Sequence, residues 1–227
     1  MSEFYCFTGP GGPEINSARQ NHLASLHLDI AGKKVLEVGA GIGLHTPFFL
    51  ERNCDITVTD GFSNNVGEIK RRHPTLNSFV LDLEQDSSLE HLGFFDIIYC
   101  YGLLYHLRNA DTALKRMSEI SNVLLLETIV STSTGDDIAF LADHGGNNGS
   151  IIGNACRPSR LWILNQLKKY YNHGYITATQ PNYPDFCSNW STVTRSATRS
   201  IFVASKTAID NPLLMTTVPM TQPVFTG

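Results

Sequence analysis

The sequence predicts a doubly wound α/β fold, in which helices cover both faces of a mostly parallel sheet. Segments with strand character alternate with segments of helical character through most of the chain. The strand segments are almost continuously apolar, as expected for parallel strands that are buried on both faces. Glycines at positions 39, 41 and 43 directly follow the first strand segment. Together these observations favour one open sheet between two layers of helices.

The order of the elements follows from composition and from the spacing of apolar residues. Runs rich in Val, Ile, Leu and Phe predict strands at residues 35–38, 55–60, 78–82, 94–100, 122–127, 174–179 and 200–205. Apolar residues at helical spacing predict helices at residues 15–28, 44–52, 66–72, 110–120 and 160–171. Pro47 is compatible with the second helix because the missing N–H of a proline has no partner to lose in a first helical turn.

A chain of 227 residues favours one domain with decorations. We predict a single domain over residues 1–206, of which 1–29 form an N-terminal arm and a lid helix. Residues 131–158 are rich in Ser, Thr, Gly, Asn and Asp and are too many for an ordinary connection, so we interpret them as an insertion. Residues 207–227 are rich in Thr and Pro and predict an extended C-terminal tail.

The charge and the cysteines limit the classes of partner and compartment. The formal net charge is −4 and the isoelectric point is about 6.0, so nothing in the overall charge favours a polyanionic partner such as nucleic acid. Five cysteines are scattered without CxxC spacing, and the histidines have no metal-ligand spacing, so we expect reduced thiols and no metal. We find no apolar run long enough to span a bilayer and no secretion signal, and expect a cytoplasmic protein.

The glycines after the first strand predict a tight turn that binds a ligand. Glycine adopts positive φ and lets a backbone approach a ligand closely. The spacing is GxGxG, whereas a dinucleotide fingerprint is GxGxxG and would need a third glycine where this chain has Leu44. A phosphate needs several free N–H groups at a helix start, so Leu44 argues against a nicotinamide dinucleotide.

Three acids lie within or at the ends of the first three strands. Glu37 is in an otherwise apolar strand, where an unpaired carboxylate is costly, so we expect it to face a ligand. Asp60 ends the second strand, where an acid accepts from both hydroxyls of a ribose. Asp82 ends the third strand and is placed to accept from an adenine amino group, with Leu83 against the ring. For Asp82 alone, capping of the next helix is an equally good interpretation.

These motifs resemble those of class I S-adenosylmethionine (SAM)-dependent methyltransferases. VLEVGAGIG, from Val35 to Gly43, is similar to the first family motif, and FDIIYCYGLLYHLRN, from Phe95 to Asn109, is similar to the motif after strand four. The match covers about residues 30–130. It implies a Rossmann-like, seven-stranded, mostly parallel sheet and SAM as the methyl donor. The cofactor-binding residues that it implies are Glu37, Gly39, Ala40, Gly41, Gly43, Asp60, Gly61, Asp82, Leu83, Cys100 and Tyr101.

The residues after strand four carry the expected chemistry. Methyl transfer is an in-line displacement, so positioning supplies much of the catalysis, and a base is needed only if the acceptor must lose a proton. His106 is the best-placed base, since neutral imidazole suits that task near pH 7. Alternatively, His106 orients the substrate or a neighbouring loop. Tyr105 is a second catalytic candidate and, with Tyr101, a candidate for lining the acceptor pocket.

Other residues are candidates for binding the acceptor. Arg19 lies on the expected lid helix, although a solvated polar face is its commoner meaning. Arg157 and Arg160 follow the insertion, where family members carry substrate-recognition elements, and are suited to a carboxylate or phosphate. They equally suit the start of the helix at Ser159. Trp190 belongs to an aromatic loop between the last two strands, on the expected ligand side.

The leading hypothesis is methyl transfer to O or N of a small molecule such as a sugar, a natural product or a peptide. A methyltransferase acting on a modified tRNA wobble base is the alternative among enzymes, because the Tyr105-His106-Leu107 step is also similar to such relatives. The charge balance argues against it, and the cluster Lys70-Arg71-Arg72 suits a solvated helix face. A non-catalytic SAM-binding protein is the alternative outside enzymes. The oligomeric state is not specified by the sequence.

Overall fold

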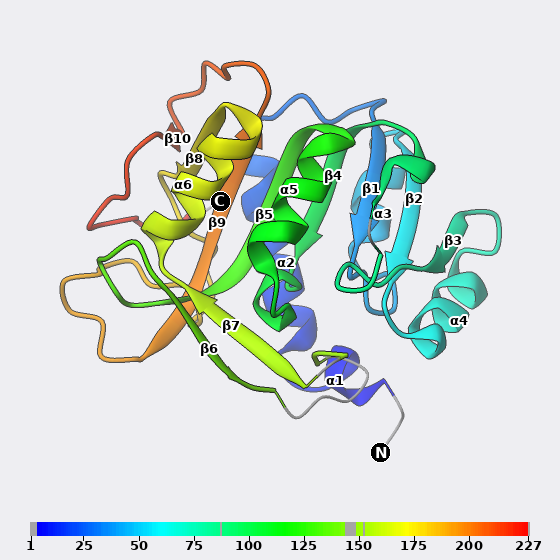
Figure 1. The fold of residues 1–227 in the computed structure, drawn as a ribbon, viewed down its shortest axis with the longest axis horizontal. Coiled ribbons are helices and arrows are strands. Elements are labelled where there is room, and N and C mark those ends of the chain that lie inside the picture. The colour runs from blue at the N-terminus through cyan, green and yellow to red at the C-terminus, as the bar shows by residue number, and fades with distance from the viewer. Residues whose placement is uncertain (1–3, 87, 144–148, 152, 227) are drawn as a thin grey trace.

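The computed structural model describes residues 4–86, 88–143, 149–151 and 153–226. Within these ranges, eight strands form one sheet and two further strands form a separate hairpin (Figure 1). The strands of the large sheet, in the order in which they lie side by side, are β10 (Leu214–Met215), β8 (His173–Thr177), β9 (Ala197–Ser205), β5 (Ser121–Ser131), β4 (Phe95–Tyr101), β1 (Lys34–Val38), β2 (Asp55–Asp60) and β3 (Asn77–Val80).

The strand directions confirm the predicted doubly wound fold. Strands β3, β2, β1, β4 and β5 are mutually parallel, whereas β9 runs antiparallel to β5 and to β8. The chain moves outward from β1 to β3 and then crosses back to β4 on the other side of β1. The strand order therefore reverses between β1 and β4, which is where open α/β sheets bind their ligands.

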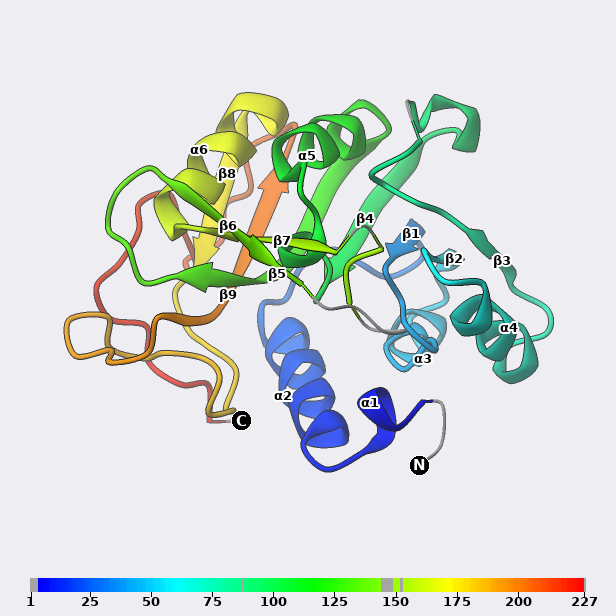
Figure 2. The same ribbon diagram turned by 60° about the horizontal axis from the view of Figure 1, so that its bottom comes forward.

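Helices lie on both faces of the sheet (Figure 2). One face carries α5 (Ala110–Glu119) and α6 (Arg160–Tyr171), and the other carries α2 (Gly12–Ser25), α3 (Thr46–Leu50) and α4 (Ser63–Arg72). Consecutive strand residues are buried in opposite layers. Val35 packs on the α2 and α3 side and Leu36 on the α5 side, because side chains alternate across a strand. This double burial explains the continuous apolar runs.

The predicted helices are all present, with small shifts at their ends. Helix α2 begins at Gly12 rather than at residue 15, with Pro13 in its first turn, and the short helix α1 (Tyr5–Thr8) precedes it. Single 3-10 turns, η1 (Glu90–Leu92) and η2 (Leu104–His106), flank β4. Across the described ranges, every helix is too short or too polar to cross a membrane.

The predicted insertion forms a β-hairpin. Strands β6 (Ile138–Ala142) and β7 (Asn154–Pro158) pair in antiparallel register, and residues 144–148 and 152, between them, lie outside the described residues. Strand β7 packs on η2, where the thiol of Cys156 donates to the Leu104 carbonyl at 3.4 Å. The hairpin therefore lies beside the residues that follow β4.

The C-terminal residues pair with the large sheet and with the loop before β9. Strand β10 pairs with β8 and adds an eighth strand to the seven that we predicted. Gln222 is fully buried and donates from Nε2 to the Thr177 carbonyl at 2.6 Å. A strand of two residues is too short to show a period-2 pattern, so no sequence pattern predicted β10.

Candidate functional site

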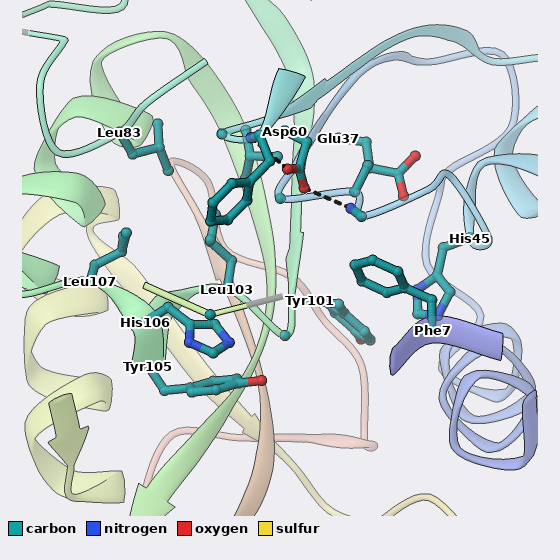
Figure 3. Close-up of a pocket in the computed structure, with 18 of the residues that line it drawn as sticks. Phe7, Glu37, His45, Asp60, Leu83, Tyr101, Leu103, Tyr105, His106 and Leu107 are labelled. Atoms are coloured by element: carbon teal, nitrogen blue, oxygen red, sulfur yellow. Dashed lines mark hydrogen bonds between the residues drawn. The ribbon is translucent and has the colours of Figure 1, made fainter. Parts of the chain in front are cut away.

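A cavity of about 270 Å³ opens at the carboxyl ends of β1, β2 and β4 (Figure 3). Its wall combines the turn after β1, the ends of β2 and β3, the residues after β4, the α1–α2 arm and the β6–β7 hairpin. Of the sequence-predicted site residues, those that line it are Arg19, Glu37, Gly39, Ala40, Gly41, Asp60, Gly61, Asp82, Leu83, Tyr101, Tyr105 and His106. The fold thus brings most of the predicted site to one place.

The turn after β1 requires glycine at two positions for two separate reasons. Gly39 and Gly41 have φ of 65° and 59°, which L side chains rarely adopt. A Cβ on Gly39 would lie 2.8 Å from Leu103, and one on Gly41 would lie 2.6 Å from Phe7 of the N-terminal arm. The backbone of the turn therefore touches both the segment after β4 and the arm. Gly43 has φ of 75° but faces away from the cavity, toward Thr46.

Asp60 ties the end of β2 to the glycine turn. Its Oδ2 accepts from the Gly41 N–H at 2.8 Å, and its Oδ1 accepts from the Phe62 N–H and the Asn65 amide, each at 2.9 Å. Figure 3 shows Asp60 beside Glu37 in the cavity wall. Burial raises the pKa of Asp60, and these three hydrogen bonds act in the opposite direction. The carboxylate lines the cavity while its partners fix its orientation.

Glu37 is the second carboxylate of the wall. It is 2% exposed, and its Oε2 accepts from the Thr46 hydroxyl at 2.7 Å. Burial raises its pKa from 4.5 to about 7, with a further contribution from Asp60, while the Thr46 hydrogen bond opposes the shift. Within the ligand-free protein, Glu37 therefore holds a proton that the unfolded chain releases at lower pH.

The raised pKa of Glu37 predicts a pH-dependent stability. Between about pH 4.5 and 7 the folded protein binds more protons than the unfolded chain, so its free energy of unfolding falls as pH rises. We expect Glu37→Gln to remove this decline. At pH 8 the free energy of unfolding of the variant should exceed that of the original protein by up to about 3 kcal/mol, and near pH 4 the two values should be equal. Urea unfolding at several pH values without cofactor measures these free energies, and Glu51→Gln, at an exposed position, is the control. Parallel pH profiles for both proteins would contradict it.

The far end of the cavity is more apolar. Leu81 and Leu83 line it together with Asp82, whose Oδ1 accepts from the Glu84 N–H at 2.9 Å. This hydrogen bond closes a turn over residues 83–85 and does not cap a helix, since the next helical element begins only at Glu90. Asp82 keeps its place in the cavity wall, in agreement with a ligand contact. Ile151 from the hairpin side covers this end, because a Cβ on Gly61 would lie 2.5 Å from its Cδ1.

The residues after β4 form the opposite end of the cavity. Tyr101, Leu103, Tyr105 and His106 all line it, and the rings of Tyr105 and His106 lie 4.0 Å apart between centroids (Figure 3). The rings of Tyr101 and Tyr99 stack with their centroids 4.3 Å apart, and burial raises the pKa of Tyr101 well above its ordinary value. Tyr101 is thus a neutral wall residue over the accessible pH range.

His106 is oriented by an acid from the hairpin. Its Nδ1 lies 2.7 Å from Oδ2 of Asp143, which directly follows β6. The same carboxylate oxygen accepts from the Ser150 N–H at 3.0 Å. Burial lowers the pKa of His106, although Asp143 acts in the opposite direction. A neutral imidazole with Nδ1–H donating to Asp143 leaves Nε2 with its lone pair.

Two arginines meet one buried glutamate beside this end. Glu127 of β5 has a side chain of 0% exposure; its Oε2 accepts from Arg19 at 2.7 Å and its Oε1 from Arg199 at 3.0 Å. Arg19 comes from α2 and Arg199 from β9, and both guanidinium groups line the cavity, whereas Glu127 does not. A Cβ on Gly102 would lie 3.6 Å from Nη2 of Arg19, so the three charges adjoin the turn after β4.

Five predicted residues lie outside the cavity wall, namely Gly43, described above, and four others. Cys100 is fully buried in the layer that faces α5, on the other side of β4 from Tyr101. Arg157 lies behind Tyr105, with Cζ 5.4 Å from the ring centroid. Arg160 and Trp190, which we predicted to bind substrate, instead pack on each other under the C-terminal tail. The Cζ of Arg160 lies 3.4 Å from the centroid of the Trp190 ring. The tail draws them there because Gln222 accepts from both side chains.

We therefore expect Arg160→Ala to affect stability and not ligand binding. Arg160 is 4% exposed and also donates to the Pro219 carbonyl at 2.8 Å. Its removal deletes two hydrogen bonds and the packing against the Trp190 ring, so the free energy of unfolding should fall by about 2 kcal/mol or more. Urea unfolding and calorimetry with S-adenosylhomocysteine (SAH) measure the two effects, with the exposed Arg108→Ala as control. Weaker SAH binding in a stably folded variant would contradict the assignment.

Sequence reasoning missed Asp143, Arg199 and Glu127. Glu127 and Arg199 are charged residues in apolar strands, the same pattern that identified Glu37, so their strand context was an available signal. Asp143 stands in a polar loop-like segment 37 residues beyond His106, and no spacing rule connects the two. Phe7, in the arm, likewise gave no signal.

The fold and this site together identify the protein as a class I SAM-dependent methyltransferase. The sheet order, the glycine turn after β1, the acids after β2 and β3 and the aromatic segment after β4 occupy the positions that this class uses. A sequence model described as a methyltransferase domain matches residues 15–170, and the chain belongs to this family.

Curated relatives are more distant. A ubiquinone biosynthesis O-methyltransferase of Xanthomonas oryzae pv. oryzae (strain PXO99A) is 27% identical over 142 residues, which cover 59% of each chain. A tRNA U34 carboxymethyltransferase of Azotobacter vinelandii (strain DJ / ATCC BAA-1303) is 33% identical over 113 residues, covering 46% of this chain and 35% of that protein. The chain matches 47% of the length of one such relative and 59% of another, roughly half.

Solved structures share the fold. The N-terminal domain of EvdMO1, determined in the presence of SAH and D-fucose, superposes with a TM-score of 0.67 at 17% identity, covering 84% of this chain and 82% of that chain. A Burkholderia thailandensis 1,6-didemethyltoxoflavin-N1-methyltransferase, with 1,6-didemethyltoxoflavin and SAH bound, has a TM-score of 0.57 at 18% identity, covering 89% of this chain and 81% of that chain. At these identities the likeness concerns the fold alone.

Proposed function

We propose that the protein transfers a methyl group from SAM to an oxygen or nitrogen of a small molecule, with His106 as the general base. The observation that carries this proposal is the His106–Asp143 pair at 2.7 Å, on the cavity wall beside the segment that follows β4. In known enzymes, a histidine held by a carboxylate is an arrangement that accepts a proton from a hydroxyl or amine.

The cavity fits SAM by the chemistry of its wall. Gly39 and Gly41 present backbone at positive φ, and a Cβ at either would fill the space beside Leu103 or Phe7. Asp60 is fixed as an acceptor suited to ribose hydroxyls, and Leu81 and Leu83 supply apolar contact for a base. When bound, SAM supplies a methyl group carried on a positively charged sulfur. Glu37 is the wall carboxylate suited to the amino-acid end.

The protein's own residues then handle the acceptor. Nδ1–H of His106 donates to Asp143, which fixes the tautomer, and Nε2 takes the proton of the attacking hydroxyl or amine. Tyr105 packs against the imidazole and limits its rotation. Tyr101 and Leu103 line the acceptor end and exclude water from it, so positioning supplies the remainder of the rate.

A small acceptor is supported by the size of the site and by the relatives. The α1–α2 arm and the connection between β6 and β7 both contribute to the wall, and the cavity of about 270 Å³ has a size suited to a small molecule. Relatives with a matching domain include a ubiquinone biosynthesis O-methyltransferase, and a structural neighbour is an N1-methyltransferase with its heterocycle bound. The net charge of −4 adds no attraction for nucleic acid.

A wobble-base acceptor is the second candidate, because the relative with 33% identity is a tRNA U34 carboxymethyltransferase. The basic cluster on α4 gives it little support. Arg71 and Arg72 both donate to the carboxylate of Glu68, at 2.7 to 2.8 Å, so their charges are partly neutralised within the helix.

The experiment is a transfer assay with tritiated methyl SAM. Phenolic, sugar and amine acceptors are compared with total tRNA, and tRNA binding is followed by gel shift at several salt concentrations. We expect label in a small molecule and only weak tRNA binding. Tight tRNA binding that weakens steeply with salt would favour the wobble-base alternative. Binding of SAH without label in any acceptor, and with His106→Asn behaving as the original protein, would favour a non-catalytic SAM-binding protein.

A further inference from the structure

The ion group formed by Arg19, Glu127 and Arg199 has an unusual charge balance. Two guanidinium groups share one carboxylate, which leaves one positive charge in excess at a buried position. Asp185 adds only a rim contact, 3.5 Å from Nε of Arg199, and it is half exposed and shared with Arg195. The excess charge therefore faces the cavity rather than a protein partner.

An unpaired hydrogen-bond donor also indicates that the arginine pair faces a ligand. Among the described residues, the buried Nε of Arg19 has no hydrogen-bond partner, although its Nη1 donates to Asn16 and its Nη2 to Glu127. Buried donors of charged groups are normally paired, because leaving one unmade is costly. A purely structural ion network would satisfy both guanidinium groups internally. Here both of them line the cavity, and one retains an unused N–H.

The other acids of the wall cannot supply the missing partner. Glu37, Asp60, Asp82 and Glu84 lie with the glycine turn or at the apolar end. Asp143 is engaged with His106 and the Ser150 N–H. The end of the cavity beside Gly102 and Tyr105 is thus its positively charged end.

We propose that Arg19 and Arg199 bind an anionic oxygen of the methyl acceptor, so that the acceptor is a compact molecule with both a nucleophilic hydroxyl or amine and an acidic group such as a carboxylate. This inference rests on the proposed function. Glu127 acts as a positioning residue, because it holds two like charges side by side and both of its own oxygens are already used. Guanidinium groups are the side chains best suited to paired hydrogen bonds with a carboxylate.

The spacing of the two functions matches a small scaffold. The ring of His106 and the Cζ of Arg199 lie 4.0 Å and 5.3 Å from the same Tyr105 ring centroid. The imidazole and the Arg199 guanidinium are therefore separated by no more than the sum of these two distances. A compact molecule that bears a hydroxyl and a carboxylate can reach both groups.

The test is calorimetric binding to the SAH-saturated protein. The probes are two matched pairs that differ only in a carboxylate, 4-hydroxybenzoate with phenol and 3,4-dihydroxybenzoate with catechol. We expect at least one acid to bind about tenfold or more tightly than its neutral partner. Arg199→Gln should abolish that preference and leave SAH affinity within about twofold. Arg195→Gln, an exposed arginine bound to the same Asp185, is the matched control and should retain the preference.

If Arg199→Gln does not fold, Arg199→Lys is used for the same binding measurements. It keeps a charge beside Glu127 but loses the planar fork, so the preference should fall severalfold in a protein of near-normal melting temperature. Equal binding of acid and neutral partner in both pairs would overturn the proposal. A loss of SAH affinity as large as the loss of acid affinity would also overturn it, because the pair would then serve the carboxylate of the cofactor. Methyl transfer to other acceptors would survive either result, so the proposed function is tested separately.

Discussion

Replacement of His106 by Asn should lower kcat/KM for methyl transfer by about a hundredfold to ten-thousandfold, the range that a positioned general base contributes. The amide keeps a polar group of similar size but cannot accept the proton at Nε2. Since His106 is on the acceptor side of the cavity, SAH affinity should stay within about twofold. The labelled-methyl assay and calorimetry measure the two quantities, and the exposed His91→Asn is the matched control.

Asp143→Asn separates the base from a merely structural histidine. The carboxylate raises the pKa of His106 against the effect of burial, so its neutralisation should lower that pKa further. The acid limb of the kcat/KM profile should then shift to lower pH, while the plateau falls about tenfold or more because the tautomer is no longer fixed. An unchanged acid limb, or normal rates for His106→Asn, would remove His106 from the mechanism.

Replacement of Asp60 by Asn should weaken SAH binding by about a hundredfold or more. The carboxylate accepts three hydrogen bonds from the protein and faces the cavity with the charge that strengthens hydrogen bonds from ribose hydroxyls. Asn keeps the volume but replaces one acceptor oxygen with a donor, which opposes the Gly41 N–H or the ligand. Two charge-assisted hydrogen bonds account for the expected size of the loss.

The matched control for this variant is Asp55→Asn, at the exposed start of the same strand. It changes the net charge equally and should leave SAH affinity unchanged. A melting temperature of Asp60→Asn near that of the original protein would show that the fold survives. Equal SAH affinity for Asp60→Asn and the original protein would contradict the role that we assign to Asp60.

Both ends of the cavity are covered by segments far from β1 in sequence. Phe7 of the arm contacts the turn at Gly41, and Ile151, which lies between β6 and β7, contacts Gly61. Asp143, which contacts His106, also lies between these two strands. Shortening this connection should therefore remove the cover at Gly61 and the acid beside His106 together.

Much of the fold could be predicted because it depends on local patterns. Apolar strands and helical spacing identified seven strands and five helices, and the position of each strand end then placed Gly39, Glu37 and Asp60 together. In a parallel sheet, the carboxyl ends of neighbouring strands share one edge, so residues at those ends meet whatever the details of the loops. The order of the motifs also carried the class of the protein.

The contacts that complete the site depend on the paths of long connections, which no local pattern encodes. Asp143 reaches His106 only because the hairpin folds back over η2, and Arg199 reaches Glu127 only because β9 inserts antiparallel beside β5. The same dependence places Arg160 and Trp190 beside Gln222 of the C-terminal tail and outside the cavity wall, which their local sequence context did not indicate. The sequence by itself determined the sheet, the glycine turn and its acids, because each follows from residues within one element. Tertiary structure alone decided which acid contacts His106 and which arginines meet Glu127 at the cavity, because those pairs join elements that are distant along the chain.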